Sequence, residues 1–174
     1  MTAPNPQERL AQSALDATRA EYEELCDQWK ALDGKAQATG AVAGVLLAGL
    51  FAFARDPVQR TVLATALLSV ATVLSLASAF LVVLAMQIRS IEPPPLGQPI
   101  VHMIENVAAK SVDDEELSTR ITFLLNDQRK LWVRPIESMR DGLSSKTNWL
   151  IGAQWALLGA LVALGATTLH RLLG

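Results

Sequence analysis

The chain has 174 residues, of which 51% are apolar and 18% are charged, and its formal net charge is −2. Soluble domains carry about 25% charged residues, so the shortage of charge argues against an ordinary soluble domain. A nucleic-acid partner is not expected either, because a protein that neutralises phosphates needs an excess of lysine and arginine.

The uncharged residues gather in three long blocks. The blocks 36–54, 61–88 and 147–169 hold 19, 28 and 23 consecutive residues without a charge. A bilayer core about 30 Å thick is crossed by roughly 20 apolar residues of helix. The sequence therefore predicts an all-α integral membrane protein with three transmembrane helices. Its cytoplasmic helical part consists of the N-terminal helix and the segment between spans two and three.

Residues 1–35 are predicted to form an amphipathic helix. Its apolar stripe alternates in steps of four and three residues: Ala11, Leu15, Thr18, Tyr22, Leu25, Trp29 and Leu32. This a/d pattern fits a helix that packs on the protein's own cytoplasmic helices, and it also fits a coiled coil between subunits. The only cysteine, Cys26, is expected to be a packing residue of this helix. Asp33-Gly34-Lys35-Ala36 is expected to separate the helix from the first span.

Small residues mark the first and third spans. The first span contains the GxxxG pair Gly40 and Gly44, extended by Ala48, and the third contains Gly152 and Gly159. Such residues let helix backbones approach closely in lipid. Packing between subunits and packing against the second span both explain them. The loop 55–60 is so short that spans one and two are expected to form an antiparallel hairpin.

The second span, 61–88, carries a series of hydroxyl side chains. They are Thr61, Thr65, Ser69, Thr72, Ser75 and Ser78. A hydroxyl face of this kind can wet a pore. It is also typical of helices whose hydroxyls bond to another helix or back to the carbonyl four residues earlier, and we favour this second interpretation.

The segment 89–146 is predicted to be a helical sensor or linker region. A proline-rich stretch at 91–99 is expected to be stiff and extended, and a short helix is expected at 100–110. A longer helix is expected from about 112 toward Met139, with a kink or a break caused by Pro135. Asp141-Gly142 is a plausible interruption before the third span.

Side chains for catalysis are nearly absent from the sequence. His102 and His170 are isolated, and no ligand set for a metal, glycine loop for a phosphate or nucleophile motif is visible. No ionisable residue lies within the three blocks, although proton-coupled transporters usually need one. We therefore expect no enzyme activity, no cofactor and no metal site.

One basic helix face is the candidate ligand site. It comprises Arg120, Asn126, Arg129, Lys130 and Arg134. Lys130 and Arg134 are i, i+4 neighbours, and such a cluster can hold a phosphate. Anionic lipid headgroups are a second possible target, and a plain solvated helix face is the third interpretation.

Lysine and arginine counts predict the orientation in the membrane. The N-terminal segment and the region 89–147 share one side of a three-span protein and hold 12 of these residues, whereas the other side holds 3. The positive-inside rule places the richer side in the cytoplasm. The N-terminus is then cytoplasmic, and the tail 170–174 is external.

Two short motifs stand at the entrances of the spans. Asp33-Gly-Lys35-Ala36 precedes the first span, and Lys146 with Trp149 and Leu150 marks the membrane interface before the third. With the hairpin and the cytoplasmic helices between them, this layout resembles the small transmembrane effectors of bacterial Pycsar anti-phage systems. It is also similar to the SLATT-type effectors of nucleotide second-messenger systems.

The resemblance implies a function. A companion cyclase would make a cyclic mononucleotide, cyclic UMP or cyclic CMP, on infection. The effector would lie in the bacterial inner membrane, sense this ligand and impair the lipid bilayer. The heptad helix and the small-residue spans fit a homo-oligomer. The alternatives are a constitutive membrane scaffold that recruits partners through its cytoplasmic helices, and a small channel subunit.

Overall fold

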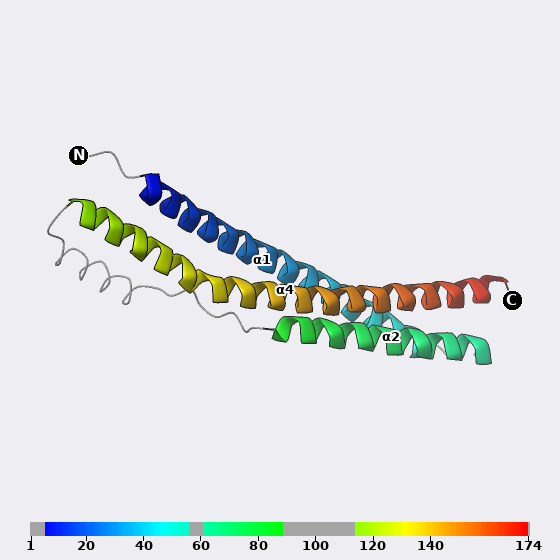
Figure 1. Ribbon diagram of the computed structural model, residues 1–174. Coiled ribbons are helices and arrows are strands. Elements are labelled where there is room, and N and C mark those ends of the chain that lie inside the picture. Colours follow the sequence, from blue (N-terminus) through cyan, green and yellow to red (C-terminus); the bar gives the residue numbers. More distant parts are fainter. Residues whose placement is uncertain (1–5, 56–60, 89–113, 174) are drawn as a thin grey trace. The chain divides into compact units, whose positions relative to one another are not determined.

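The computed structural model describes residues 6–55, 61–88 and 114–173. They form three helices, α1 (Pro6–Arg55), α2 (Val62–Gln87) and α4 (Asp114–Leu173), and no strand occurs among them (Figure 1). Each helix is long and apolar enough to cross a membrane. The predicted all-α class with three spans is therefore confirmed. The expected stiff segment 91–99 and short helix 100–110, with His102, lie outside the described residues.

None of the three expected helix breaks, at Gly34, at Pro135 and at Gly142, occurs in the described helices. α1 runs through Gly34 without a break, and α4 runs through both Pro135 and Gly142. A proline removes one backbone hydrogen bond from a helix interior, so its cost has to be offset by packing. Pro135 is itself buried, next to buried Ile136. Burial of Pro135 and Ile136 thus helps to offset the lost hydrogen bond and keeps the helix continuous.

The chain divides into two compact units. Unit 1 comprises Met1–Gln28 and Ser90–Gly142, and unit 2 comprises Trp29–Arg89 and Leu143–Gly174. The three uncharged blocks fall in unit 2, whereas most charged residues fall in unit 1. Unit 2 therefore contains the three blocks that are predicted to cross the membrane.

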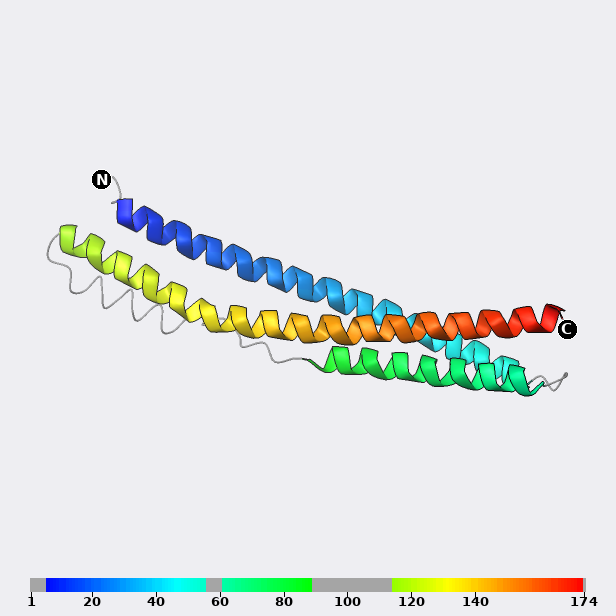
Figure 2. The same ribbon diagram turned by 45° about the vertical axis from the view of Figure 1, so that its right-hand side comes forward.

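In unit 1 the start of α1 packs against the start of α4. Leu15 and Leu25 of α1 and Met139 of α4 are buried. Tyr22 and Trp132 meet edge to face with ring centroids 5.2 Å apart, a favoured aromatic geometry. Figures 1 and 2 both show these two segments, blue and yellow-green, running alongside each other. The heptad stripe of α1 thus packs within the chain, as the first of its two interpretations expects.

In unit 2 the three helices share a core built on one spacing. The buried residues of α2 are Ala64, Ala71, Ser75, Ser78, Val82 and Ala85. Their steps of seven, four and three residues repeat every 3.5 residues on average, which is the seam of a left-handed coiled coil. Ala36, Val82, Leu150 and Ala153 form one core cluster, and Leu50, Ala71 and Ala163 form another.

The small residues of the spans divide into two groups. A Cβ added at Gly40, Gly152 or Gly159 would lie 3.3, 3.4 or 3.0 Å from a side chain of α2. These three glycines therefore let α1 and α4 approach α2 closely. A Cβ at Gly44 would meet nothing within 4 Å, and Ala48 is exposed. Within the described chain, the GxxxG pair does not form one contact surface.

Most hydroxyl groups at the start of and along α2 bond to backbone carbonyls. Thr65, Ser69, Thr72 and Ser75 each donate to the carbonyl four residues earlier. Ser78 instead donates to the Ala153 carbonyl of α4 at 2.8 Å. Thr61 caps α2, and its Oγ1 lies 3.3 Å from His170 Nε2. Bonding to backbone carbonyls, which we favoured over the pore interpretation, is therefore confirmed.

Candidate functional site

Lys146 is the most deeply buried charged residue among those that the structure describes, and it belongs to unit 2. Its side chain is 1% exposed, and its Nζ donates to Asp33 Oδ1 at 2.5 Å. The same Nζ lies 4.3 Å from the centre of a Trp29 ring. A buried ammonium without partners is very unfavourable, so the carboxylate and the aromatic face together hold this cation in place.

The register of α4 explains why a lysine is buried at this position. Met139, Leu143, Lys146, Leu150 and Ala153 follow steps of four, three, four and three residues, and all five are buried. Lys146 thus occupies a seam position in an otherwise apolar series. The sequence marked it only as an interfacial residue. Because Lys146 occupies a heptad position at which its neighbours are apolar, the sequence pattern could have indicated that its side chain is buried.

The ion pair joins the two entrance motifs. Asp33 lies one turn before Ala36 on α1, and Lys146 lies one turn before Leu150 on α4. Ala36 and Leu150 belong to the same core cluster of unit 2. The two motifs, more than a hundred residues apart in sequence, therefore form one contact at the start of the membrane helices. This cluster can hold two helices in register, but it offers no nucleophile or metal ligand set.

The predicted ligand residues lie on α4 in unit 1. Asn126, Arg129, Lys130 and Arg134 are exposed, whereas Arg120 is partly buried and pairs with Glu116. Lys130 lies 3.9 Å from Asp127, which is a weak contact for exposed charges.

Helix spacing groups three of the five predicted residues. Asn126, Lys130 and Arg134 follow one another at intervals of four residues and so share one face of α4. Phe123, which is 69% exposed, precedes Asn126 by three residues on the same face. We call Phe123, Asn126, Lys130 and Arg134 the α4 polar stripe. Arg120 and Arg129 lie at other angles around the helix.

Unit 1 also has an open groove of about 450 Å³. It is lined by Glu8, Arg9, Gln12, Ser13, Asp16, Ile121 and Leu125. The Gln12 amide donates to both carboxylate oxygens of Asp16, at 3.1 and 3.3 Å. With two carboxylates against one guanidinium, the groove carries excess negative charge. It is therefore poorly suited to an anionic ligand, and none of the predicted ligand residues lines it.

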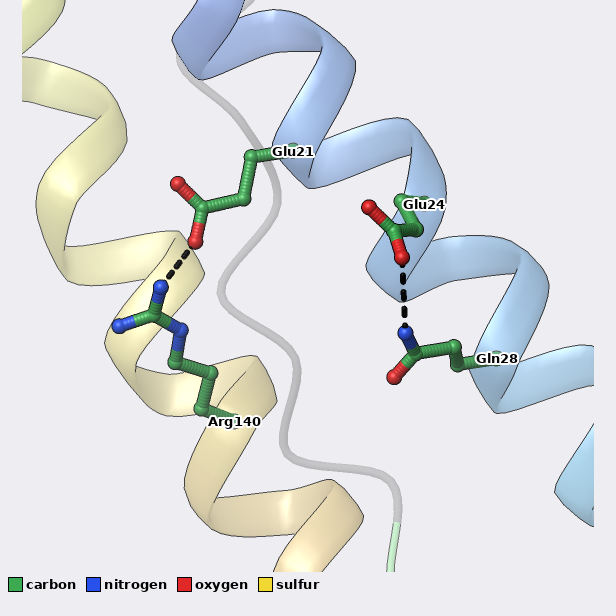
Figure 3. Close-up of polar contacts among 4 residues, drawn as sticks. All are labelled: Glu21, Glu24, Gln28 and Arg140. Atoms are coloured by element: carbon green, nitrogen blue, oxygen red, sulfur yellow. Dashed lines mark hydrogen bonds and ion pairs between the residues drawn. The ribbon is translucent and has the colours of Figure 1, made fainter.

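Another interhelical pair of unit 1 lies near the Tyr22–Trp132 contact. Figure 3 shows Arg140 of α4 reaching Glu21 of α1, beside the pair that Gln28 and Glu24 form within α1. Both members of the Arg140–Glu21 pair are exposed enough for water to screen them, so the pair contributes about 1 kcal/mol at most. The pair therefore contributes more to the register of the two helices than to the stability of the protein.

The comparison with protein families identifies the chain. Residues 17–171 match the model of the Pycsar effector protein domain. The chain belongs to the Pycsar effector family. The match spans the Asp33–Lys146 pair and the α4 polar stripe. No curated protein and no solved structure matches significantly.

Membership of this family fixes the general role. This Pycsar effector is a membrane effector of an anti-phage system that signals through a cyclic nucleotide. A companion cyclase that produces the nucleotide belongs to such a system. Among the described residues, no group of three His, Cys, Asp or Glu side chains is arranged to hold a metal ion.

Proposed function

We propose that this Pycsar effector is activated by a cyclic pyrimidine mononucleotide, cyclic UMP or cyclic CMP, and then impairs the inner membrane to abort infection. It acts by binding and not by catalysis. The observation that carries the proposal is the family match over residues 17–171, which includes described residues of both units. The N-terminus and unit 1 face the cytoplasm, where the nucleotide is made, and the C-terminus faces outward.

The α4 polar stripe is the proposed binding surface within unit 1. Lys130 and Arg134 supply charge-assisted donors for the single phosphate of the ligand. Asn126 offers both a donor and an acceptor for a base edge, and the exposed Phe123 ring offers a stacking face. Arg120 already pairs with Glu116, so its contribution is expected to be smaller.

Activation follows from differential affinity. A ligand that binds the active arrangement better than the resting one shifts the population toward the active arrangement. We propose that the active state is a homo-oligomer in the membrane, with no nucleic acid involved.

The test is a calorimetric titration of the full-length protein in detergent with cyclic UMP, CMP, AMP and GMP. One pyrimidine nucleotide is expected to bind saturably. The double variant Lys130→Ala/Arg134→Ala should bind at least about tenfold more weakly, because each hydrogen bond to a charged group contributes about 1.5–3 kcal/mol. Arg19→Ala is the matched control, since Arg19 is an exposed cation of α1 in the same unit.

The outcomes separate the sensor from its site. Binding that the double variant leaves unchanged would retain the nucleotide sensor and reject the α4 polar stripe. The absence of binding to all four nucleotides would favour the constitutive scaffold. In a second assay, vesicles that contain the protein should release a trapped dye only after the nucleotide that binds is added.

A further inference from the structure

A polar side chain is exposed on the membrane surface of α4. Gln154 follows Ala153, whose carbonyl accepts the hydrogen bond from Ser78 of α2. Ser78 lies nine residues before Gln87, the last residue of α2, which corresponds to about 13 Å along a helix. Gln154 thus lies about 13 Å inside the end of α2, and a hydrocarbon core about 30 Å thick includes this depth.

Gln154 and its neighbour Trp155 lack partners in the part of the chain that the structure describes. Gln154 is exposed, Trp155 is 69% exposed, and neither the amide nor the indole N–H makes a hydrogen bond there. Lipid tails cannot accept or donate a hydrogen bond. An unsatisfied polar group at this depth is costly, so these side chains point to a protein partner within the membrane.

The surrounding residues form a second seam on α4. Ile151, Gln154, Leu158, Leu161 and Gly165 follow steps of three, four, three and four residues, and all of them are exposed. We call these five residues the outer seam. Its spacing equals that of the buried seam that packs on α1 and α2, so it has the period of a helix–helix contact. Gly165 allows close approach, since a Cβ there would meet nothing within 4 Å.

We infer that the outer seam binds the outer seam of a second copy of this chain. Copies inserted in the same orientation have parallel α4 helices, and a two-fold axis along the membrane normal places equal residues at equal depth. A glutamine amide is both donor and acceptor. Gln154 and its copy therefore satisfy each other, as a single buried polar residue does in a coiled coil. This dimer contact is present with and without the nucleotide, so it belongs to both the resting and the active arrangement, and the proposed activation acts on other contacts.

Cysteine cross-linking of the full chain in lipid vesicles tests the contact. On a Cys26→Ser background, Leu158→Cys should give a disulfide-linked dimer with a copper–phenanthroline oxidant. Val73→Cys is the control, because Val73 is exposed on α2. Its neighbour Leu74 lies beside Gly159, the neighbour of Leu158, so the two cysteines would lie at about the same depth. This control should stay monomeric.

A second substitution tests the role of the amide. Adding Gln154→Leu to Leu158→Cys should weaken the association about three- to twentyfold, the range expected for one interhelical hydrogen bond in a membrane. Gln154→Asn should restore part of it. The Gln154→Leu variant is expected to fold, because an exposed leucine suits lipid. Circular dichroism checks that its helicity is retained. Equal cross-linking of Leu158→Cys and Val73→Cys, or an unchanged dimer fraction with Gln154→Leu, would overturn the inference.

Discussion

Lys146 and Asp33 form an asymmetric ion pair. The lysine side chain is 1% exposed, whereas the aspartate side chain is 38% exposed. Water can therefore solvate the carboxylate if its partner is lost, but it cannot reach the ammonium. Removing one member of a buried pair is costly chiefly because the other charge stays buried and unpaired. The two halves of this pair are thus expected to respond differently to substitution.

Asp33→Asn is expected to destabilise the protein by about 3–5 kcal/mol, because it leaves a buried ammonium with only the Trp29 ring. Lys146→Met keeps the length of the side chain and leaves a partly hydrated carboxylate, so the loss should be about 1 kcal/mol or less. Thermal unfolding in detergent measures both variants. The double variant should regain most of the stability that Asp33→Asn loses. An equal loss in both single variants would contradict this asymmetry.

Tyr22 is the only tyrosine of the chain, so its titration can be followed directly. Burial in unit 1 raises its pKa above the ordinary value of 10.0, and the neighbouring Cys26 raises it further. A raised pKa means that folding favours the neutral phenol. The associated stability is present below pH 10 and is lost as the pH rises through the folded-state pKa. Phenolate absorbance against pH should give a midpoint above 10.0.

Cys26→Ser is the matched variant for this titration. It should lower the midpoint but leave it above 10.0, because burial is the larger cause. A midpoint at or below 10.0 in the native protein would show that Tyr22 is not packed against Trp132 as described.

Residue roles could be predicted where they depend on local spacing. The hydroxyl groups of α2 were expected to bond to carbonyls because a serine or threonine reaches its own helix four residues back. The partner of Lys146 could not be predicted in this way. Asp33 lies more than a hundred residues away, and only the packing of α1 on α4 brings the two side chains together.

At the scale of the elements, the spacing of apolar residues was a better guide than the helix-breaking residues. The seam of α1 continues from Trp29 through Ala36 and Ala43 to Leu50, all of them buried. Glycine is a poor helix former, but the cost of Gly34, roughly 1 kcal/mol, is small beside the burial of several seam residues. Local propensity therefore suggested a boundary that tertiary packing overrides.

Gly34→Ala is expected to stabilise the protein by about 0.5–1 kcal/mol, because alanine restricts the unfolded chain and favours the helix. The added Cβ would meet nothing within 4 Å. Gly159→Ala is the control, because its Cβ would lie 3.0 Å from Leu74 Cδ1 and crowd the contact with α2. Chemical unfolding in detergent compares the two variants. A loss of stability in Gly34→Ala would show that α1 needs a bend at this residue.

At the scale of the whole molecule, the three uncharged blocks were sufficient to predict the membrane part. Their absence of charge reflects one strong constraint, the cost of charge in hydrocarbon. No comparable constraint marks the ligand site, because an exposed cation on a helix looks the same whether it binds a nucleotide, a lipid headgroup or water. The α4 polar stripe therefore remains a prediction that depends on binding data.

The orientation in the membrane gives the last prediction. The segments flanking the spans on the N-terminal side hold 12 lysines and arginines against 3 on the other side, and this bias predicts that the richer side lies in the cytoplasm. Alkaline phosphatase fused after Gly174 should be active in bacteria, since it folds only outside the cytoplasm. The same enzyme fused before Met1 should be inactive, and green fluorescent protein at that end should fluoresce. The reverse pattern would place unit 1 outside the cell, away from any nucleotide that a cytoplasmic cyclase makes.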